Sequence, residues 1–163
     1  MKNIVLIGMP GAGKSTVGIV LAKAVKMKFV DTDLFIQEET GRHLQEILDT
    51  EGTTTFQKRE EEIILSHQFH NTVIATGGSV VLSPKAMKHL KRDSLIIYLN
   101  VSLAEIERRL VNITTRGIVL EQGQTLHAVY DQRIPMYEKY ADITINCSGL
   151  DFEGVVAKIL GRV

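Results

Sequence analysis

The sequence has no tryptophan, a single cysteine and only three prolines among its 163 residues. The lone Cys147 cannot form an internal disulfide, which excludes a bridged secreted framework and predicts a reducing compartment. Long hydrophobic runs are also missing: none approaches the ~20 residues of a spanning helix, and the short apolar run before Gly8 is too brief for a signal-peptide core. These absences predict a cytoplasmic protein without a membrane partner.

An excess of charge of one sign is absent as well. The 19 Lys and Arg side chains balance 19 Asp and Glu side chains, so no binding to nucleic acid is expected. The hydrophobic fraction of 44% is ordinary for a globular protein. Because no linker, repeat or low-complexity tract divides the chain, residues 1–163 are predicted to form one domain, and we expect a monomer.

A glycine-rich stretch at residues 8–16 is the most informative part of the chain. It reads Gly-Met-Pro-Gly-Ala-Gly-Lys-Ser-Thr and matches the phosphate-binding pattern G-x-x-x-x-G-K-[ST] at every fixed position. An apolar strand is expected before it, at residues 4–7, and a helix after it, at residues 14–25. The alternative is a turn that binds nothing. Agreement of pattern and context favours a nucleoside triphosphate site.

The chemistry of such a loop follows from its residue types. Glycines let the backbone amides approach an anion, and the dipole of the following helix favours negative charge. We expect Lys14 to reach the terminal phosphates and the Ser15 hydroxyl to ligate Mg²⁺. The predicted nucleotide-binding residues of the loop are Gly11, Ala12, Gly13, Lys14, Ser15 and Thr16.

Strand-like and helix-like segments alternate along the rest of the chain. Further strands are expected at residues 28–30, 72–76, 95–99 and 143–145, with helices at 44–48, 56–65, 84–90, 103–111, 126–140 and 152–160. Gly52 is expected to close the turn after the helix at 44–48. The charged run at 57–62 is expected to be mostly a solvated face, with one or two members pointing at a ligand. This alternation predicts an α/β fold with a parallel sheet covered on both faces.

Candidate ligand-binding residues follow two of the strands. Asp31 and Asp33 end the second strand, and Gly77 and Gly78 follow the third, at the sheet edge where open α/β folds bind ligands. The simpler interpretations are a helix cap for either aspartate and a plain turn for the glycines. The connection at residues 112–124 is long and contains Arg116, so it is either a lid over the phosphates or a surface loop.

With these pieces in place, the whole chain resembles the shikimate kinase family of P-loop kinases. The motifs that carry the resemblance are residues 8–16, Asp31-Thr32-Asp33, Thr40-Gly41-Arg42, Phe56 with Glu60 and Glu61, Gly77-Gly78, Arg109, Arg116, and Arg133-x-Pro135-x-Tyr137. The resemblance implies a three-layer fold with a five-stranded parallel sheet in the order 2-3-1-4-5, an acceptor-binding region at about 33–60 and a lid at about 111–124. Related kinases, such as gluconate kinase, share only part of this set.

The resemblance also implies an activity and roles for single residues. The activity is transfer of the ATP γ-phosphate to a hydroxyl of shikimate, a step of aromatic amino-acid biosynthesis that gives shikimate 3-phosphate and ADP. By position, Lys14, Asp33 and Arg116 are implied to be catalytic. Lys14 would hold the β- and γ-phosphates, Asp33 would orient or deprotonate the attacking hydroxyl, and Arg116 would close onto the phosphates. Mg²⁺ would be held by Ser15 and, through water, by Asp31.

The remaining implied contacts divide between the two substrates. Arg109 would lie against adenine, Gly77 and Gly78 would offer backbone contacts to the acceptor, and Arg133 would pair with the acceptor carboxylate. Each role is carried over from the matching position of the family's pattern.

Three departures from the family's pattern concern the acceptor side and the lid. Gln57 stands where the family has a second carboxylate-binding arginine, Ser79 replaces a third glycine, and Gly117 replaces a proline expected to stiffen the lid. We expect Ser79 either to narrow the acceptor pocket or to add a hydrogen bond. The departures leave two alternatives: a kinase for another small hydroxy acid or hydroxy amino acid, and a nucleotide-binding regulatory module without catalysis.

Overall fold

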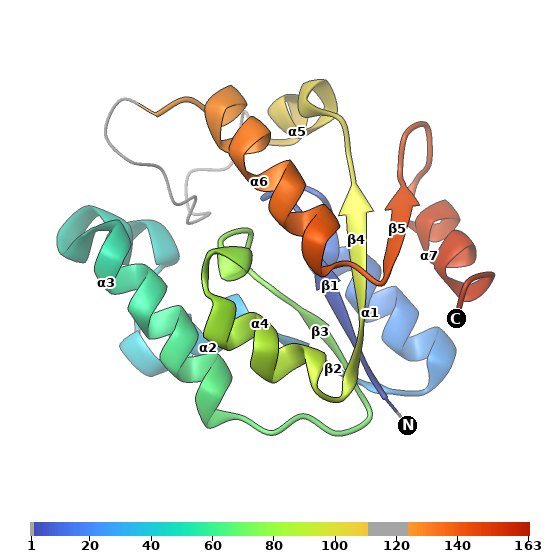
Figure 1. Cartoon of the computed structure of the whole chain (residues 1–163), viewed down its shortest axis with the longest axis horizontal. Coiled ribbons are helices and arrows are strands. Elements are labelled where there is room, and N and C mark those ends of the chain that lie inside the picture. Colours follow the sequence, from blue (N-terminus) through green and yellow to red (C-terminus); the bar gives the residue numbers. More distant parts are fainter. Residues whose placement is uncertain (1, 111–123) are drawn as a thin grey trace.

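The computed structural model of this chain describes residues 2–110 and 124–163, in which strands and helices alternate (Figure 1). The strands are β1 (Asn3–Ile7), β2 (Lys28–Asp31), β3 (Thr72–Ala75), β4 (Ser94–Asn100) and β5 (Ile143–Asn146). The helices are α1 (Lys14–Val25), α2 (Thr32–Thr40), α3 (Leu44–Ser66), α4 (Pro84–Lys91), α5 (Leu103–Leu110), α6 (Leu126–Tyr140) and α7 (Phe152–Leu160), with a 3-10 turn η1 (Val80–Leu82).

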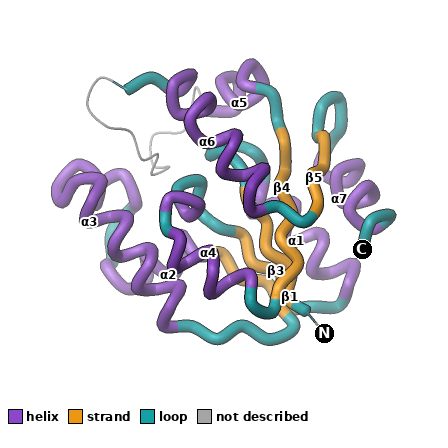
Figure 2. Tube along the Cα trace, viewed as in Figure 1, coloured by secondary structure: helices purple, strands orange, loops and turns teal. Residues whose placement is uncertain are grey.

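The strands form one parallel sheet in the order β2-β3-β1-β4-β5, which confirms the predicted topology. β1 is central and buried along its whole length, as its unbroken apolar sequence predicts for a strand covered on both faces. Because the strands are parallel, their carboxyl ends share one edge of the sheet. The loops that follow β1 and β3 and the start of α2 meet at this edge (Figure 2).

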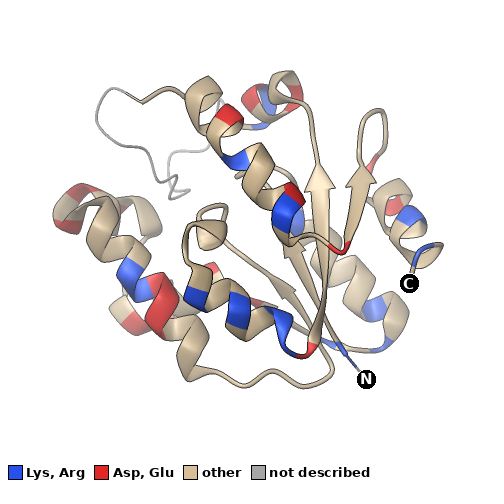
Figure 3. Cartoon of the chain, in the orientation of Figure 1, with Lys and Arg blue, Asp and Glu red and all other residues tan. Residues whose placement is uncertain are grey.

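Helices cover both faces of the sheet. In Figure 1, α4 and α6 lie in front of the sheet and α1 lies behind it, where it packs against α7. Burial of apolar side chains such as Val17 and Leu21 of α1 supplies the main stabilisation of this layer. Charged side chains are frequent on the helices, whereas β4 carries none (Figure 3). Among the described residues, no helix combines the length and apolarity needed to cross a bilayer.

A second, smaller apolar cluster lies between α2 and α3. It is separate from the main core of the sheet and consists of Ile36, Leu44, Ile47, Leu48, Phe56 and Ile63. The acceptor-binding region predicted at 33–60 therefore has a small apolar core of its own, although it lies between β2 and β3 in the sequence. The predicted lid at 111–124 lies, except for Gln124, outside the described residues.

Helix α3 differs from the two helices that the sequence predicts. One helical segment spans Leu44–Ser66, and the expected break is a kink at Gly52, where φ is +84° and ψ is 172°. The positive φ confirms the need for glycine, but the second half begins before residue 56. The Glu51 carboxylate accepts hydrogen bonds from Arg42 and Arg59, each at 2.8 Å. The ion pair between Arg59 and Glu51 spans the kink, whereas Arg42 binds Glu51 from the chain that precedes α3.

Candidate active site

The loop between β1 and α1 has the conformation that its glycines permit. Gly8, Gly11 and Gly13 all have positive φ, at +152°, +85° and +91°. A Cβ on Gly13 would lie 2.6 Å from the ring of Phe152, so a side chain is excluded there. The backbone can therefore curve around an anion at the N-terminus of α1, as the sequence pattern predicts.

Lys14 is buried in the concave side of this loop. Its side-chain amine Nζ donates hydrogen bonds to the backbone oxygens of Gly8 at 2.6 Å and Met9 at 2.8 Å. The ammonium group thus lies where the loop closes on itself, in position to meet phosphate oxygens.

Ser15 and Asp31 bring two oxygen ligands together at the start of α1 and the end of β2. The Ser15 hydroxyl donates to Asp31 Oδ2 at 2.5 Å, and Asp31 Oδ1 accepts from the backbone N–H of Asp33 at 2.9 Å. Asp31 is therefore the N-cap of α2, which confirms the capping interpretation, and it is also the neighbour of Ser15; its role toward a ligand stays a prediction. A hydroxyl beside a carboxylate fits Mg²⁺, which prefers oxygen ligands and completes its shell with water and phosphate.

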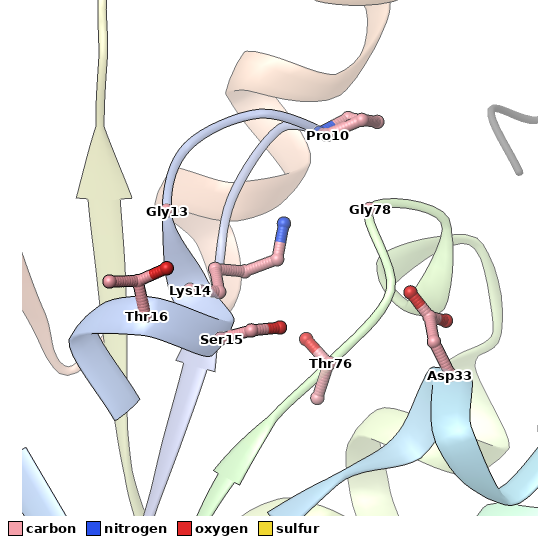
Figure 4. Close-up of a pocket in the computed structure, with 8 residues that line it drawn as sticks. All are labelled: Pro10, Gly13, Lys14, Ser15, Thr16, Asp33, Thr76 and Gly78. Atoms are coloured by element: carbon pink, nitrogen blue, oxygen red, sulfur yellow. The ribbon is translucent and has the colours of Figure 1, made fainter. Parts of the chain in front are cut away.

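These residues line one pocket at the carboxyl edge of the sheet. Its walls are Pro10, Gly13, Lys14, Ser15, Thr16, Asp33, Thr76 and Gly78. Figure 4 shows Lys14 and Ser15 on one side and the Asp33 carboxylate across from them, with the Thr76 hydroxyl between. Since Asp31 caps α2, the side chain of Asp33 is left to face the pocket. A phosphate donor and a hydroxyl acceptor could meet between these walls.

The glycines after β3 make close contacts that a side chain would prevent. A Cβ on Gly77 would lie 2.6 Å from Glu60 Oε2 and 2.8 Å from Asp33 Oδ1, and one on Gly78 would lie 2.5 Å from the ring of Pro10. The Tyr137 hydroxyl donates to the Gly78 carbonyl at 2.7 Å, which fixes the loop against α6. The predicted importance of both glycines thus has a steric reason.

Ser79 adds a hydrogen bond and does not narrow the pocket. Its buried hydroxyl donates to Glu60 Oε1 at 2.9 Å. Glu60 is itself buried, and burial and then the nearby charge of Asp33 raise the pKa of its carboxyl to about 8. The hydrogen bond from Ser79 and the charges of Arg133 and Lys14 act in the opposite direction. Ser79 therefore links the glycine loop to helix α3.

Arg133 lies buried on α6, with 2% of its surface exposed. Burial raises the pKa of Tyr137, and the positive charge of Arg133 is the largest effect opposing that rise. The same charge acts on Glu60, so Arg133 lies near Glu60, on the side of the pocket that the family resemblance predicts to hold the acceptor (the acceptor wall). Gln57 is half-buried on α3, three residues before Glu60 and hence on the same side of the helix.

A second pocket lies beside the phosphate loop, next to Arg109. Its lining includes Ser102, Glu105 and Leu150. The Arg109 guanidinium donates to Gly11 O at 3.0 Å and lies 5.6 Å from the centre of the Phe152 ring. A planar cation and an exposed aromatic ring held in this way can flank a nucleobase.

The model of the shikimate kinase family matches residues 10–163. The chain is also 41% identical over 163 residues to a shikimate kinase of Thermodesulfovibrio yellowstonii, covering 98% of this chain and 94% of that protein. A shikimate kinase of Francisella tularensis subsp. novicida is 35% identical, with coverage of 97% and 92%.

The chain belongs to the shikimate kinase family. Its structure resembles that of a shikimate kinase from Acinetobacter baumannii in complex with shikimate, with a TM-score of 0.90, 29% identity and coverage of 99% of this chain and 92% of that one. A gluconokinase from Sinorhizobium meliloti has a TM-score of 0.52 at 13% identity and shares the fold alone, with coverage of 98% and 90%.

Set beside the shikimate kinase pattern, the structure brings together most of the predicted site residues. Gly13, Lys14, Ser15, Thr16, Asp33 and Gly78 line one pocket, with Asp31, Gly77 and Arg109 bonded or packed beside it. Ala12 is buried within the phosphate loop. Gln57 is on the correct side of α3 but does not line that pocket. Arg116 and Gly117 lie outside the described residues.

No site role was predicted from the sequence for Thr76, Phe152 or Glu60, although Glu60 was part of a motif that carries the family resemblance. Thr76 lines the pocket and donates to Leu6 O at 2.8 Å, Phe152 faces Arg109, and Glu60 meets Asp33 over Gly77. A signal existed for Glu60, because it lies four residues after Phe56 and four before Ile64, on the apolar face of α3. Nothing in the sequence around Phe152 distinguishes it from an ordinary exposed helix residue.

Proposed function

We propose that the protein transfers the γ-phosphate of ATP to a hydroxyl of shikimate, giving shikimate 3-phosphate and ADP in aromatic amino-acid biosynthesis. The observation that carries the proposal is the pocket in which Lys14 and Ser15 face Asp33, in a chain of the shikimate kinase family. In the A. baumannii relative, shikimate itself is bound.

On the donor side, the loop amides and Lys14 bind the β- and γ-phosphates. Phosphoryl transfer spreads negative charge over the equatorial oxygens of the transferred group, so catalysis depends on positioning and on fixed positive charge. Lys14 supplies that charge from the loop, and we propose that Arg116 adds a second one. Ser15 and, through water, Asp31 would hold Mg²⁺, which neutralises phosphate charge when bound.

On the acceptor side, Asp33 receives the hydroxyl that attacks the γ-phosphate. Its carboxylate accepts the hydroxyl hydrogen and directs the oxygen toward the donor, a step that requires contact at hydrogen-bond distance. The lack of side chains at Gly77 and Gly78 lets Asp33, Glu60 and Pro10 approach the loop closely, and we propose that the loop backbone contacts the acceptor. We propose that Arg133 pairs with the acceptor carboxylate.

Gln57 favours a second candidate for the acceptor. A neutral amide offers one donor group, whereas an arginine offers a charged fork that matches a carboxylate. A small hydroxy acid or hydroxy amino acid with a different carboxylate position is therefore the second candidate. A regulatory module that only binds nucleotide would have no need of Asp33 in the pocket.

The first test is an ADP-release assay with a panel of acceptors. We expect shikimate to stimulate ADP release well above the hydrolysis of ATP alone, and chelation of Mg²⁺ with EDTA to abolish that stimulation. Shikimate, gluconate, serine and homoserine are compared at equal concentration. Stimulation by one of the others alone would replace shikimate as the acceptor, and stimulation by none would support the binding module.

A second test concerns the proposed nucleobase contact. Phe152→Ala is expected to raise the KM for ATP by about two- to tenfold, because an aromatic contact of this kind contributes roughly 0.5–1.5 kcal/mol. The KM for the acceptor should change less than about twofold. Leu160→Ala is the matched control, since Leu160 is an exposed apolar residue at the other end of the same helix. Equal effects of the two substitutions would contradict the proposed contact.

A further inference from the structure

Glu60 is the buried acidic residue that the proposed mechanism does not yet use. It has 3% of its surface exposed, in the middle of α3, and its Oε1 accepts the hydrogen bond from Ser79. Its Oε2 is buried and has no hydrogen-bond donor among the described residues. A buried carboxylate oxygen without a donor is costly, whereas a protonated one becomes a donor itself.

The surroundings of Oε2 show where such a proton would point. Oε2 and Asp33 Oδ1 both lie within 3 Å of the place that a Cβ on Gly77 would occupy, at 2.6 and 2.8 Å. The carboxyl groups of Glu60 and Asp33 therefore lie next to each other, beside the Cα of Gly77. The other titratable or charged groups facing Glu60 are Lys14 from α1, and Arg133 with Tyr137 from α6.

We propose that Glu60 positions Asp33 by donating a hydrogen bond from Oε2–H to the Asp33 carboxylate, while the Ser79 hydroxyl holds Oε1. Ser79, which stands in place of a third glycine, then connects the loop after β3 to α3 through this hydrogen bond. Asp33 keeps its negative charge and lines the pocket, while the protonated Glu60 behind it adds no second negative charge. The inference rests on the proposed phosphoryl transfer for its kinetic consequence.

The kinetic consequence is an alkaline limit on acceptor use. When Glu60 ionises, the hydrogen bond to Asp33 is lost and a second negative charge lies beside the Asp33 carboxylate, close to the site of an anionic acceptor. Because the pKa of Glu60 is about 8, kcat/KM for shikimate is expected to fall about tenfold between about pH 7 and pH 9. In Glu60→Gln, which cannot ionise, this fall should be absent.

Removal of the Ser79 hydroxyl should move the limit in a defined direction. The hydrogen bond from Ser79 favours the ionised form of Glu60. Ser79→Ala should therefore shift the midpoint of the fall to higher pH, and Ser79→Thr, which keeps a hydroxyl, should restore it. Glu61→Gln is the matched control, because Glu61 is the next residue and its carboxylate accepts from Ser83 instead. Its pH profile should match that of the unchanged protein.

A measurement without catalysis tests the same protonation. The pKa of Glu60 is raised from 4.5 to about 8 in the folded state, so the stability that its proton contributes is complete below about pH 4.5 and is lost as the pH rises through about 8. The Tm of Glu60→Gln relative to the unchanged protein should therefore increase between about pH 5 and pH 8. The difference should then stay constant at higher pH.

The two measurements separate the failure of the proposed function from the failure of this inference. If no acceptor is phosphorylated but the Tm difference grows with pH as expected, the kinase assignment fails and the buried protonated Glu60 stands. If shikimate is phosphorylated and the alkaline fall persists in Glu60→Gln, or the Tm difference is constant from about pH 5 to pH 8, the positioning role of Glu60 is wrong. An unshifted midpoint in Ser79→Ala would likewise exclude the anchoring role of Ser79.

Discussion

Asp33→Asn is expected to lower kcat for shikimate phosphorylation by about 10²- to 10⁴-fold, the usual contribution of a positioned acid–base group. The substitution preserves the size of the side chain but removes its capacity to accept a proton. The KM for ATP should change less than about twofold, since the nucleotide is held by the loop and Lys14 on the opposite wall. Steady-state kinetics with each substrate varied in turn measure both effects.

The structure makes this substitution a clean test of function. Asp31, not Asp33, caps α2, because its Oδ1 accepts from the Asp33 backbone N–H. The Tm of Asp33→Asn should therefore stay close to that of the unchanged protein. Asp49→Asn is a suitable control, because Asp49 is exposed and, among the described residues, its carboxylate accepts a side-chain hydrogen bond from Gln45 alone. Normal turnover together with a lowered Tm would show that Asp33 is structural.

Gln57→Arg is expected to lower the KM for shikimate by about ten- to hundredfold. A charge-assisted contact to a carboxylate is worth on the order of 1.5–3 kcal/mol. Gln57 is half-buried and one helical turn before Glu60, so a longer cationic side chain can extend toward the acceptor wall where Arg133 lies. Initial rates at saturating ATP and varied shikimate give the change in KM.

Two comparisons show whether the gain comes from the acceptor carboxylate. The shikimate methyl ester lacks the negative charge, so the advantage of Gln57→Arg should disappear with it. Gln57→Lys supplies a charge without the planar fork and should give a smaller gain. An unchanged or higher KM for shikimate in Gln57→Arg would mean that the pocket recognises its acceptor by another arrangement.

The fold was predictable because its signals are local and repeat along the chain. The apolar run of β1, the glycine loop and the Ser83 cap of α4 each predict one element, and the alternation of strands and helices predicts the parallel sheet. In α3 the break predicted at Gly52 is present as a non-helical residue, but the ion pair between Arg59 and Glu51 that spans it was not predicted. Contacts between residues eight or nine apart are weak signals in a sequence.

The phosphate loop was predictable for the same reason, since it is one continuous motif. The acceptor wall combines Asp33, Glu60, the loop after β3 and Arg133, which come from distant parts of the chain. The choice between capping and binding at Asp31 and Asp33 depended on which side chain faces the α2 backbone. The hydrogen bond from Ser79 to Glu60 could not be predicted, because it requires Glu60 to be buried and a run of charged residues is ordinarily solvated.

The hydrogen bonds from Lys14 to the carbonyls of Gly8 and Met9 imply that nucleotide binding is an exchange. The ammonium group has backbone partners before ATP arrives, so phosphate oxygens must replace existing bonds and do not simply fill empty ones. The net affinity that Lys14 provides is then the difference between the free energy of its bonds to phosphate and that of its bonds to the backbone. That difference widens as negative charge develops on the leaving β-phosphate during transfer, so the same side chain contributes more to turnover than to ATP retention.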